Sequence, residues 1–294
     1  MEPIFLYDTT LRDGTQGENV SFSADEKVKI AERLDSLGIH YIEGGWPGSN
    51  PKDIQFFDMA RRVKFKQARL ASFGATRKPG ISPEDDANLK ALLETHTPVM
   101  TIFGKSWDLH VEKIMENTLS ENLAMISESI EYLKSKHKEV IYDAEHFFDG
   151  FKENSDYAYR TIFAAIEAGA DTIVFCDTNG GTLPFEVESI IREVFERIEK
   201  DRAFSTDDPG PKFGIHTHND CGLAVANSIT AVRLGLTMVQ GTINGYGERC
   251  GNADLTSIIP ILSEKMDLQC IPRANLSQLR SLSSYVSETA NLVP

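Results

Sequence analysis

The sequence is poor in cysteine, in basic residues relative to acidic ones, and in long apolar runs. Its four cysteines (Cys176, Cys221, Cys250 and Cys270) form no C-x-x-C pair, which is typical of free thiols in a reducing compartment. Thirty Lys and Arg face 44 Asp and Glu, for a net charge of −14, so the chain lacks the basic footprint that neutralises nucleic-acid phosphates. No apolar run approaches the ~18 residues of a membrane-spanning helix. We therefore expect no nucleic-acid partner and no membrane partner.

The N-terminus lacks the basic start and the apolar stretch of a signal peptide, because MEPIFLYDTT enters a strand-like segment directly. Together with the free thiols, this predicts a cytoplasmic protein. The composition, 41% hydrophobic and 25% charged over 294 residues, is that of a globular protein. The length fits one large α/β domain or two ordinary domains.

What the sequence does contain is a regular alternation of short apolar, β-branched runs with amphipathic stretches. The stretches at 24–37 and 157–168 place their apolar residues on one helix face. Three helical stretches end in a glycine that leads at once into the next strand, in DSLGIHYIE, EAGADTIVF and RLGLTMVQG. The strands are expected at 4–8, 40–43, 68–74, 99–103, 140–145, 172–177, 213–218 and 237–242.

Eight such units with parallel connections predict an α/β fold, a TIM (β/α)8 barrel, with an extra C-terminal helix at 277–292. The alternative is a doubly wound open sheet, but TTLRDGTQG after the first strand has the wrong glycine spacing for the phosphate loop of that fold. We expect the barrel to occupy 1–270, and 271–294 to begin a helical linker or subdomain.

Two of the seven histidines lie close together in GIHTHND. On a strand, residues i and i+2 point the same way, so His216 and His218 are expected to face the barrel interior at the end that carries active sites in this fold. Two imidazoles in that position are natural metal ligands. The alternative is a pair of buried histidines satisfied by hydrogen bonds.

A carboxylate from another strand end would complete a metal site, and DTTLRDGTQ after the first strand supplies Asp13. Two imidazoles and one carboxylate leave coordination positions open for the oxygens of a substrate. Arg12, beside it, would place a fixed positive charge where an oxygen becomes anionic. A surface salt bridge between Arg12 and Asp13 is the alternative.

Three motifs, DTTLRDGTQ, HTHND and NGYGERCGNADL, together resemble the DRE-TIM metallolyases, and within them the Claisen-condensing synthases for 2-isopropylmalate, homocitrate and citramalate. The resemblance covers essentially the whole barrel. It implies a divalent metal (Zn, Mn or Mg), a choice that the donor set leaves open. The metal residues that it implies are Asp13, His216, His218 and, completing or supporting the site, Asn252.

The same resemblance implies roles for residues around the metal. Arg12 matches the residue that stabilises the developing enolate or alkoxide, and Gln16 matches a contact near the keto acid. In YDAEHFFDG, Glu145 matches a Glu implicated in substrate binding and catalysis, with a mere pairing to Arg12 as the alternative. In FCDTNGGTLP, Thr178 matches a position that holds the keto-acid carboxylate, and Asp177 is expected to be an orienting group.

Four stretches, LYDTTLRDGTQGENVSFS, EGGWPGSNPKD, FGKSW and DAEHFFDG, most resemble citramalate synthases of the longer type. This implies an acyltransferase that condenses acetyl-CoA, the co-substrate, with pyruvate and then hydrolyses the thioester. The alternatives are 2-isopropylmalate or homocitrate synthase, because a methylene in an apolar pocket changes binding by only ~1–3 kcal/mol. Cleavage of the hydroxymethylglutaryl-CoA lyase type and a non-catalytic keto-acid-binding barrel are more distant alternatives.

The resemblance further implies that the chain is the catalytic part of a longer protein. In the family, a His and a Tyr from a segment after the barrel serve the acetyl-CoA half-reaction, and the sequence stops about where that segment would begin. The full-length protein is expected to be a homodimer.

Some residues outside the motifs have open interpretations. Arg77, Lys78 and Lys105 lie near strand ends and are candidate anion contacts. Trp46 and Trp107 either line the pocket or pack a loop. Cys221 is expected to be a small packing residue rather than a fourth metal ligand. These candidates are Arg77, Lys78, Lys105, Trp46, Trp107 and Cys221.

Overall fold

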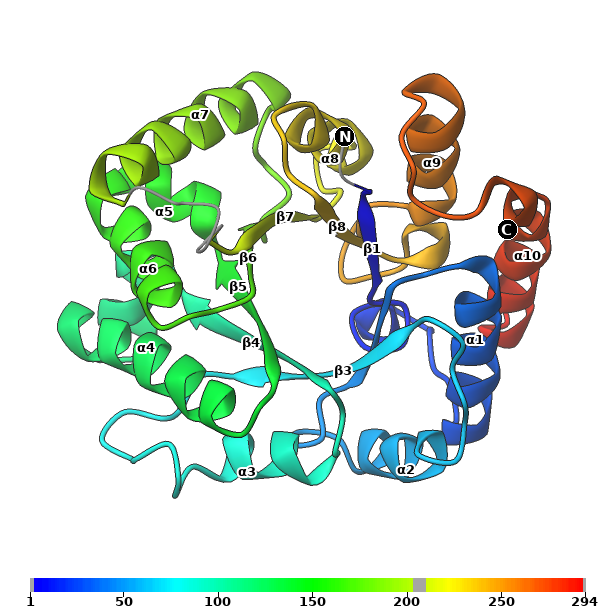
Figure 1. Ribbon diagram of the computed structural model, residues 1–294, viewed down its shortest axis with the longest axis horizontal. Helices are drawn as coiled ribbons and strands as arrows, with labels where there is room; N and C mark the ends of the chain where they lie inside the picture. Colours follow the sequence, from blue (N-terminus) through cyan, green and yellow to red (C-terminus); the bar gives the residue numbers. More distant parts are fainter. Residues whose placement is uncertain (1–2, 203–209, 293–294) are drawn as a thin grey trace.

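The structure, a computed structural model, describes residues 3–202 and 210–292. Eight parallel strands close into a barrel in chain order, with β8 pairing back to β1 (Figure 1). The strands are β1 Phe5–Asp8, β2 Tyr41–Gly45, β3 Arg69–Ala75, β4 Val99–Lys105, β5 Glu139–Glu145, β6 Thr172–Asp177, β7 Lys212–Thr217 and β8 Met238–Gly241. The predicted TIM barrel is confirmed, and each predicted strand end lies within two residues of the observed one.

Helices surround the barrel and follow the strands in turn (Figure 1). They are α1 Ala24–Leu37, α2 Pro51–Ala60, α3 Ala87–Glu94, α4 Leu119–Ser135, α5 Phe147–Glu153, α6 Ser155–Glu167, α7 Pro184–Asp201, α8 Ala224–Arg233 and α9 Leu255–Pro260. Short 3-10 or π turns are η1 Gly14–Gln16, η2 His110–Ile114, η3 Ile243–Gly245, η4 Ile261–Lys265 and η5 Arg273–Gln278. Among the described residues, no helix is both long and apolar enough to cross a membrane.

The expected extra C-terminal helix is α10 Leu279–Thr289, which begins two residues later than predicted, because η5 ends at Gln278, and ends three residues earlier. It lies beside α1 at the outside of the barrel (Figure 1). There the Arg33 guanidinium of α1 stacks 3.8 Å above the Tyr285 ring of α10. The domain boundary at 270/271 stays a prediction.

The three helix-ending glycines have the expected left-handed backbone. Gly38, Gly169 and Gly235 have φ values of 111°, 84° and 100°, which a residue with a Cβ adopts only at a cost. At the other end of α1, Ser23 and Glu26 form a reciprocal capping box. These signals set where each helix stops and the next strand begins.

The hydrophobic core has two parts. The larger part lies between the strands and the helices, and the smaller part fills the barrel itself with Tyr7, Tyr41, Ala71, Val99, Ile141, Val174, Cys176 and Met238. Because side chains alternate along a strand, the next inward position lies two residues farther on, toward the C-terminal end. There, most strands carry a polar or aromatic side chain, as in Glu43, Phe73, Thr101, Asp143, His216 and Gln240. The apolar side chains thus fill the barrel on the N-terminal side of these positions, and the polar groups meet at its C-terminal end.

Asp35 joins the segment before β3 to helix α1. Its buried carboxylate accepts hydrogen bonds from the backbone N–H groups of Lys66, Gln67 and Ala68 at 2.8–3.0 Å. Replacing it with alanine leaves these donors without that acceptor, so Asp35→Ala is expected to lower the free energy of unfolding by about 2–3 kcal/mol. Urea denaturation measures this, with exposed Glu32→Ala on the same helix as the control. Equal midpoints for the two variants would contradict the expectation.

Candidate metal centre and active site

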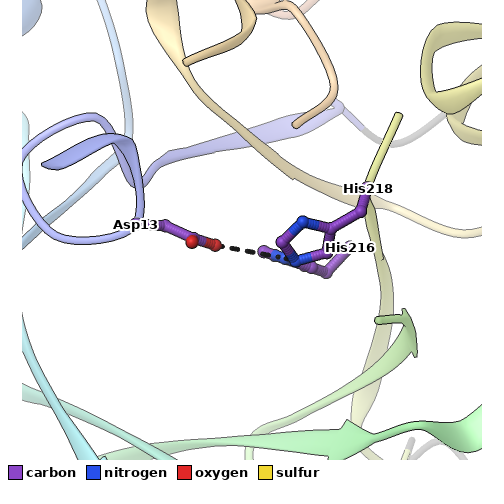
Figure 2. A group of neighbouring side chains, drawn as sticks. All are labelled: Asp13, His216 and His218. Carbon is purple, nitrogen blue, oxygen red and sulfur yellow. Dashed lines mark hydrogen bonds and ion pairs between the residues drawn. The ribbon is translucent and has the colours of Figure 1, made fainter. Parts of the chain in front are cut away.

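Three metal-binding atoms converge at the C-terminal end of the barrel (Figure 2). The Nε2 atom of His216 lies 3.2 Å from the Nε2 atom of His218 and 3.3 Å from an Asp13 carboxylate oxygen. Ligands bound to one ion at about 2.0–2.2 Å are themselves about 3 Å apart. His216 is the penultimate residue of β7, and Asp13 lies between β1 and η1, so the C-terminal ends of two strands that are far apart in the sequence bring the group together. Their side chains fit a single divalent ion.

Two of the three groups, Asp13 and His218, have pKa shifts that suit a cation, whereas the nearby Asp13 carboxylate outweighs burial and raises the pKa of His216. Burial opposes the charge on Asp13, but Arg12 and His216 outweigh it and hold the pKa of Asp13 well below its usual range. Burial and the neighbouring His216 lower the pKa of His218 to about 3. Asp13 is therefore a carboxylate and His218 a neutral imidazole, the forms that bind metals.

Asn252 holds Asp13 in place. Its Nδ2 donates to Asp13 Oδ2 at 2.8 Å, and its backbone forms an isolated β-bridge with His218. Within the described chain, the buried Oδ1 of Asn252 and Nδ1 of His218 have no hydrogen-bond partner. An unpaired buried polar atom costs about 1–3 kcal/mol, and a cation bound beside the Asn252 oxygen would relieve that cost for Asn252.

Arg12 is held by groups from two other strands. Its Nε donates to Glu43 Oε1 at 2.6 Å, and its guanidinium lies 3.7 Å above the centre of the Phe73 ring. Tyr7 donates to the other Glu43 oxygen at 2.7 Å. Burial opposes the charge, but the carboxylates of Glu43 and Asp13 outweigh it and raise the pKa of Arg12. The interpretation of Glu145 as the partner of Arg12 is therefore wrong, and Glu43 has that place.

A pocket of about 200 Å³ opens above these groups. Seven of the eight predicted site residues line it: Arg12, Asp13, Gln16, Glu145, Thr178, His216 and His218. Asn252 reaches the site through Asp13 instead of lining the pocket. The remaining wall consists of Trp46, Phe73, Phe103, Asp143, Cys176 and Glu248.

A model of the family described as HMGL-like matches residues 3–286. That range covers the barrel and most of α10. The chain belongs to the HMGL-like family. The resemblance inferred from the three motifs is confirmed at this level.

Curated HMGL-like relatives share substantial identity with the chain. The (R)-citramalate synthase of Geobacter sulfurreducens is 55% identical over 100% of this chain and 54% of that protein. The (R)-citramalate synthase of Aquifex aeolicus is 52% identical over 99% of this chain and 53% of that protein. A 2-isopropylmalate synthase of Brevibacillus brevis is 34% identical over 100% of this chain and 54% of that protein. The chain thus spans about half the length of the curated relatives it matches.

Solved structures of HMGL-like fold support the architecture. The HMG-CoA lyase of Bacillus subtilis superposes with a TM-score of 0.79 at 21% identity, covering 99% of this chain and 95% of that one. Hydroxymethylglutaryl-CoA lyase from Pseudomonas aeruginosa gives 0.78 at 15% identity, covering 99% and 94%. At these identities the likeness shows the fold alone.

Glu145 and Thr178 lie on neighbouring strand ends of the HMGL-like barrel. Glu145 forms an ion pair with Lys105 of β4. Thr178 Oγ1 accepts a hydrogen bond at 2.9 Å from the backbone N–H of His146, whose φ of 56° is left-handed. Asp177 accepts from the Thr182 hydroxyl at 2.8 Å, which fits the expected orienting role.

Several candidate contacts have other partners. Arg77 forms ion pairs with Glu121 and Glu128, so the expectation that it meets a substrate anion is wrong. Trp107 stacks on the His110 ring at 4.7 Å and packs its loop, whereas Trp46 lines the pocket. Lys105 is occupied by Glu145.

Cys221 is exposed, so its expected packing role is wrong. The next helix, α8, begins only at Ala224, three residues after Cys221. A turn of exposed backbone separates HTHND from α8, and Cys221 lies in that turn. It is not part of the converging group of donors.

Three buried polar residues of the site were not predicted from the sequence, namely Glu43, Asp143 and Gln240. Each is a polar side chain at an inward position of a predicted strand. A charged or amide group on the buried face of a barrel strand near its C-terminal end is the signal that would have found them.

Proposed function

We propose that the chain is the catalytic barrel of a citramalate synthase. In this reaction, acetyl-CoA condenses with the 2-keto acid pyruvate, and the thioester is hydrolysed to release citramalate and CoA. The observation that carries the proposal is the convergence of Asp13, His216 and His218 beside a fixed Arg12 in one pocket. The citramalate synthases at 43–55% identity support the choice of reaction.

Asp13, His216 and His218 would hold the divalent metal, with Asn252 supporting Asp13. Two nitrogens and one carboxylate oxygen accept Zn²⁺, Mn²⁺ or Mg²⁺, and the choice among them is left to experiment. When bound, the ion supplies a Lewis acid for the oxygens of the keto acid.

Arg12 supplies a second, permanent charge. Negative charge develops on the C2 oxygen of the keto acid when the acetyl carbon attacks C2, and the oxygen later takes up a proton to become the hydroxyl of the product. Glu43 and Phe73 fix the guanidinium beforehand, so its positive charge is in place without reorganisation during the reaction.

Thr178 and Gln16 have side-chain donors that no acceptor among the described residues occupies, and these suit the keto-acid carboxylate. The Thr178 oxygen already accepts from His146, so its hydroxyl hydrogen is available to donate. The Gln16 carbonyl faces Arg12 at 3.4 Å, which leaves its amide hydrogens for a substrate oxygen.

Glu145 is the carboxylate of this chain that we assign to catalysis. It lines the pocket, and the ion pair with Lys105 fixes its position. A carboxylate at this place accepts or directs the proton that leaves the acetyl methyl group, or the proton of the water that cleaves the thioester.

An aromatic wall, defined as Trp46, Phe73 and Phe103, favours pyruvate over larger 2-keto acids. The Trp46 ring stands edge-on to Phe73 and Phe103 at 5.7 and 5.6 Å, and these two stack at 5.4 Å. We infer that these three packed rings, one of which lies under the Arg12 guanidinium, limit the space for a branched alkyl group. This aromatic wall is the feature that leads us to favour pyruvate over the larger keto acid of a 2-isopropylmalate synthase.

Enlarging the wall should change the preferred keto acid. Phe103→Ala is expected to lower the ratio of kcat/KM for pyruvate to that for 2-ketoisovalerate by about 10–100-fold, since the void accepts the extra methyl groups. Phe195→Ala, which removes an aromatic side chain on α7, is the control for general loss of packing. An unchanged ratio in Phe103→Ala would remove this wall as the source of selectivity.

The reaction itself is tested by incubating the protein with Mn²⁺, acetyl-CoA and ¹³C-labelled pyruvate. Citramalate in the carbon spectrum and one equivalent of free CoA thiol are the expected products. Condensation with 2-ketoisovalerate alone would change the product to isopropylmalate. Release of acetyl-CoA from hydroxymethylglutaryl-CoA would instead assign a lyase.

A further inference from the structure

Gln240, on β8, links one proposed metal ligand to a buried carboxylate. Its Oε1 lies 2.9 Å from His216 Nδ1, and its Nε2 donates to Asp143 Oδ1 at 2.9 Å. The side chain is fully buried, and Gln240 pairs in register with His216 across β7 and β8. The chain Asp143–Gln240–His216 thus crosses the inside of the barrel from β5 to β7.

The chain of bonds has a fixed direction. The Gln240 amide turns its NH₂ group toward Asp143 Oδ1, which accepts the hydrogen bond from Nε2. The Gln240 carbonyl oxygen then faces His216, and Nδ1 of His216 must carry the hydrogen. The lone pair of the neutral ring is left on Nε2, the atom that lies next to His218 and Asp13.

We propose that Gln240 is a positioning residue of the metal centre, which fixes the tautomer and the ring orientation of His216 through Asp143. The inference rests on the metal centre proposed above. His218 has no comparable support, because its Nδ1 has no partner within residues 3–202 and 210–292. The outer partner of a ligating histidine commonly strengthens metal binding, and in this site that support comes through Gln240.

Gln240→Leu keeps the approximate volume and removes both hydrogen bonds. Zn²⁺ and Mn²⁺ affinities, measured by competition with a chelating dye, are expected to fall about 10–100-fold. In the zinc-loaded protein, the Nδ1–H proton of His216 is expected as an exchange-protected NMR signal that disappears in Gln240→Leu. Exposed Gln55→Leu on α2 is the matched control for the same substitution and should leave both readouts unchanged.

A double variant that exchanges the amide and the carboxylate distinguishes a positioning role of Gln240 from a packing role. Gln240→Glu alone sets a second carboxylate against Asp143 and should weaken metal binding. In the double variant Asp143→Asn/Gln240→Glu, the new amide donates to the new carboxylate, whose other oxygen accepts from His216. The bonds and the net charge match those of the wild type, so metal affinity and the Nδ1–H signal should return.

The outcomes distinguish the inference from the metal centre on which it rests. If the wild-type protein binds no divalent ion, the proposed metal centre itself is contradicted. Wild-type binding with unchanged affinity in Gln240→Leu would overturn the role of Gln240 alone. If Gln240→Leu fails to fold, as circular dichroism reports, the double variant decides: affinity no better than in Gln240→Glu would overturn the inference, and recovered affinity would support it.

Discussion

Arg12→Gln is expected to lower kcat about 100–1,000-fold, the usual cost of removing one preorganised group that stabilises an oxyanion. The guanidinium lies at the pocket beside Asp13 and is held by Glu43 and the Phe73 ring. Its charge matters most when the keto oxygen becomes anionic, so the loss should appear in kcat more than in the affinity for pyruvate. Steady-state kinetics with CoA thiol detection measures both.

The same substitution leaves Glu43 buried without its cation. Breaking a buried ion pair by removing one partner costs about 3–5 kcal/mol, so instability alone would mimic a catalytic effect. The control is the double variant Arg12→Gln/Glu43→Gln, in which no unpaired charge remains. A folded double variant with wild-type kcat would show that Arg12 has only a structural role.

His218→Ala is expected to abolish metal-dependent turnover and to weaken Mn²⁺ binding by more than the 10–100-fold expected for an outer partner such as Gln240. The effect should be confined to the metal, because His218 Nε2 contacts only His216 among the side-chain hydrogen bonds of the described residues. His216 Nε2 keeps its contact with Asp13, so removing the His218 side chain leaves no other buried side chain of the described residues without a partner.

Isothermal calorimetry with Mn²⁺ and steady-state turnover check this expectation. His137→Asn, which replaces an exposed imidazole in a left-handed position that Asn tolerates, is the control. Full turnover in His218→Ala at the Mn²⁺ concentration that saturates the wild type would exclude His218 as a ligand.

The fold could be predicted from the sequence because the local signals for strands, helices and helix ends agree with the repeating pattern of the whole barrel. Apolar runs of strand length, amphipathic helices and glycine caps at Gly38, Gly169 and Gly235 all repeat with the barrel's period. The three proposed ligands were accessible for a related reason: the C-terminal ends of parallel barrel strands meet, whatever the details of packing. That rule brings Asp13 to His216 across more than two hundred residues.

The side-chain contacts between different strands of the barrel could not be predicted in the same way. Whether Arg12 meets Glu43 or Glu145 depends on strand tilt and stagger, which no local pattern encodes. Phe73 and Phe103 read as ordinary strand residues, and only the closed barrel turns them toward the pocket. Gln240 lies in a strand without any motif, so its link to His216 emerges only from the register of β7 and β8.

We propose above that Asp13, His216 and His218 hold a divalent ion that binds a small 2-keto acid. The most direct test is calorimetric titration of pyruvate into the protein with Mn²⁺, repeated with chelator and with His216→Ala. We expect pyruvate binding that requires the metal and is lost in both repeats, with weaker binding of 2-ketoisovalerate. Pyruvate binding that persists without metal, or no binding of either acid in its presence, would contradict it.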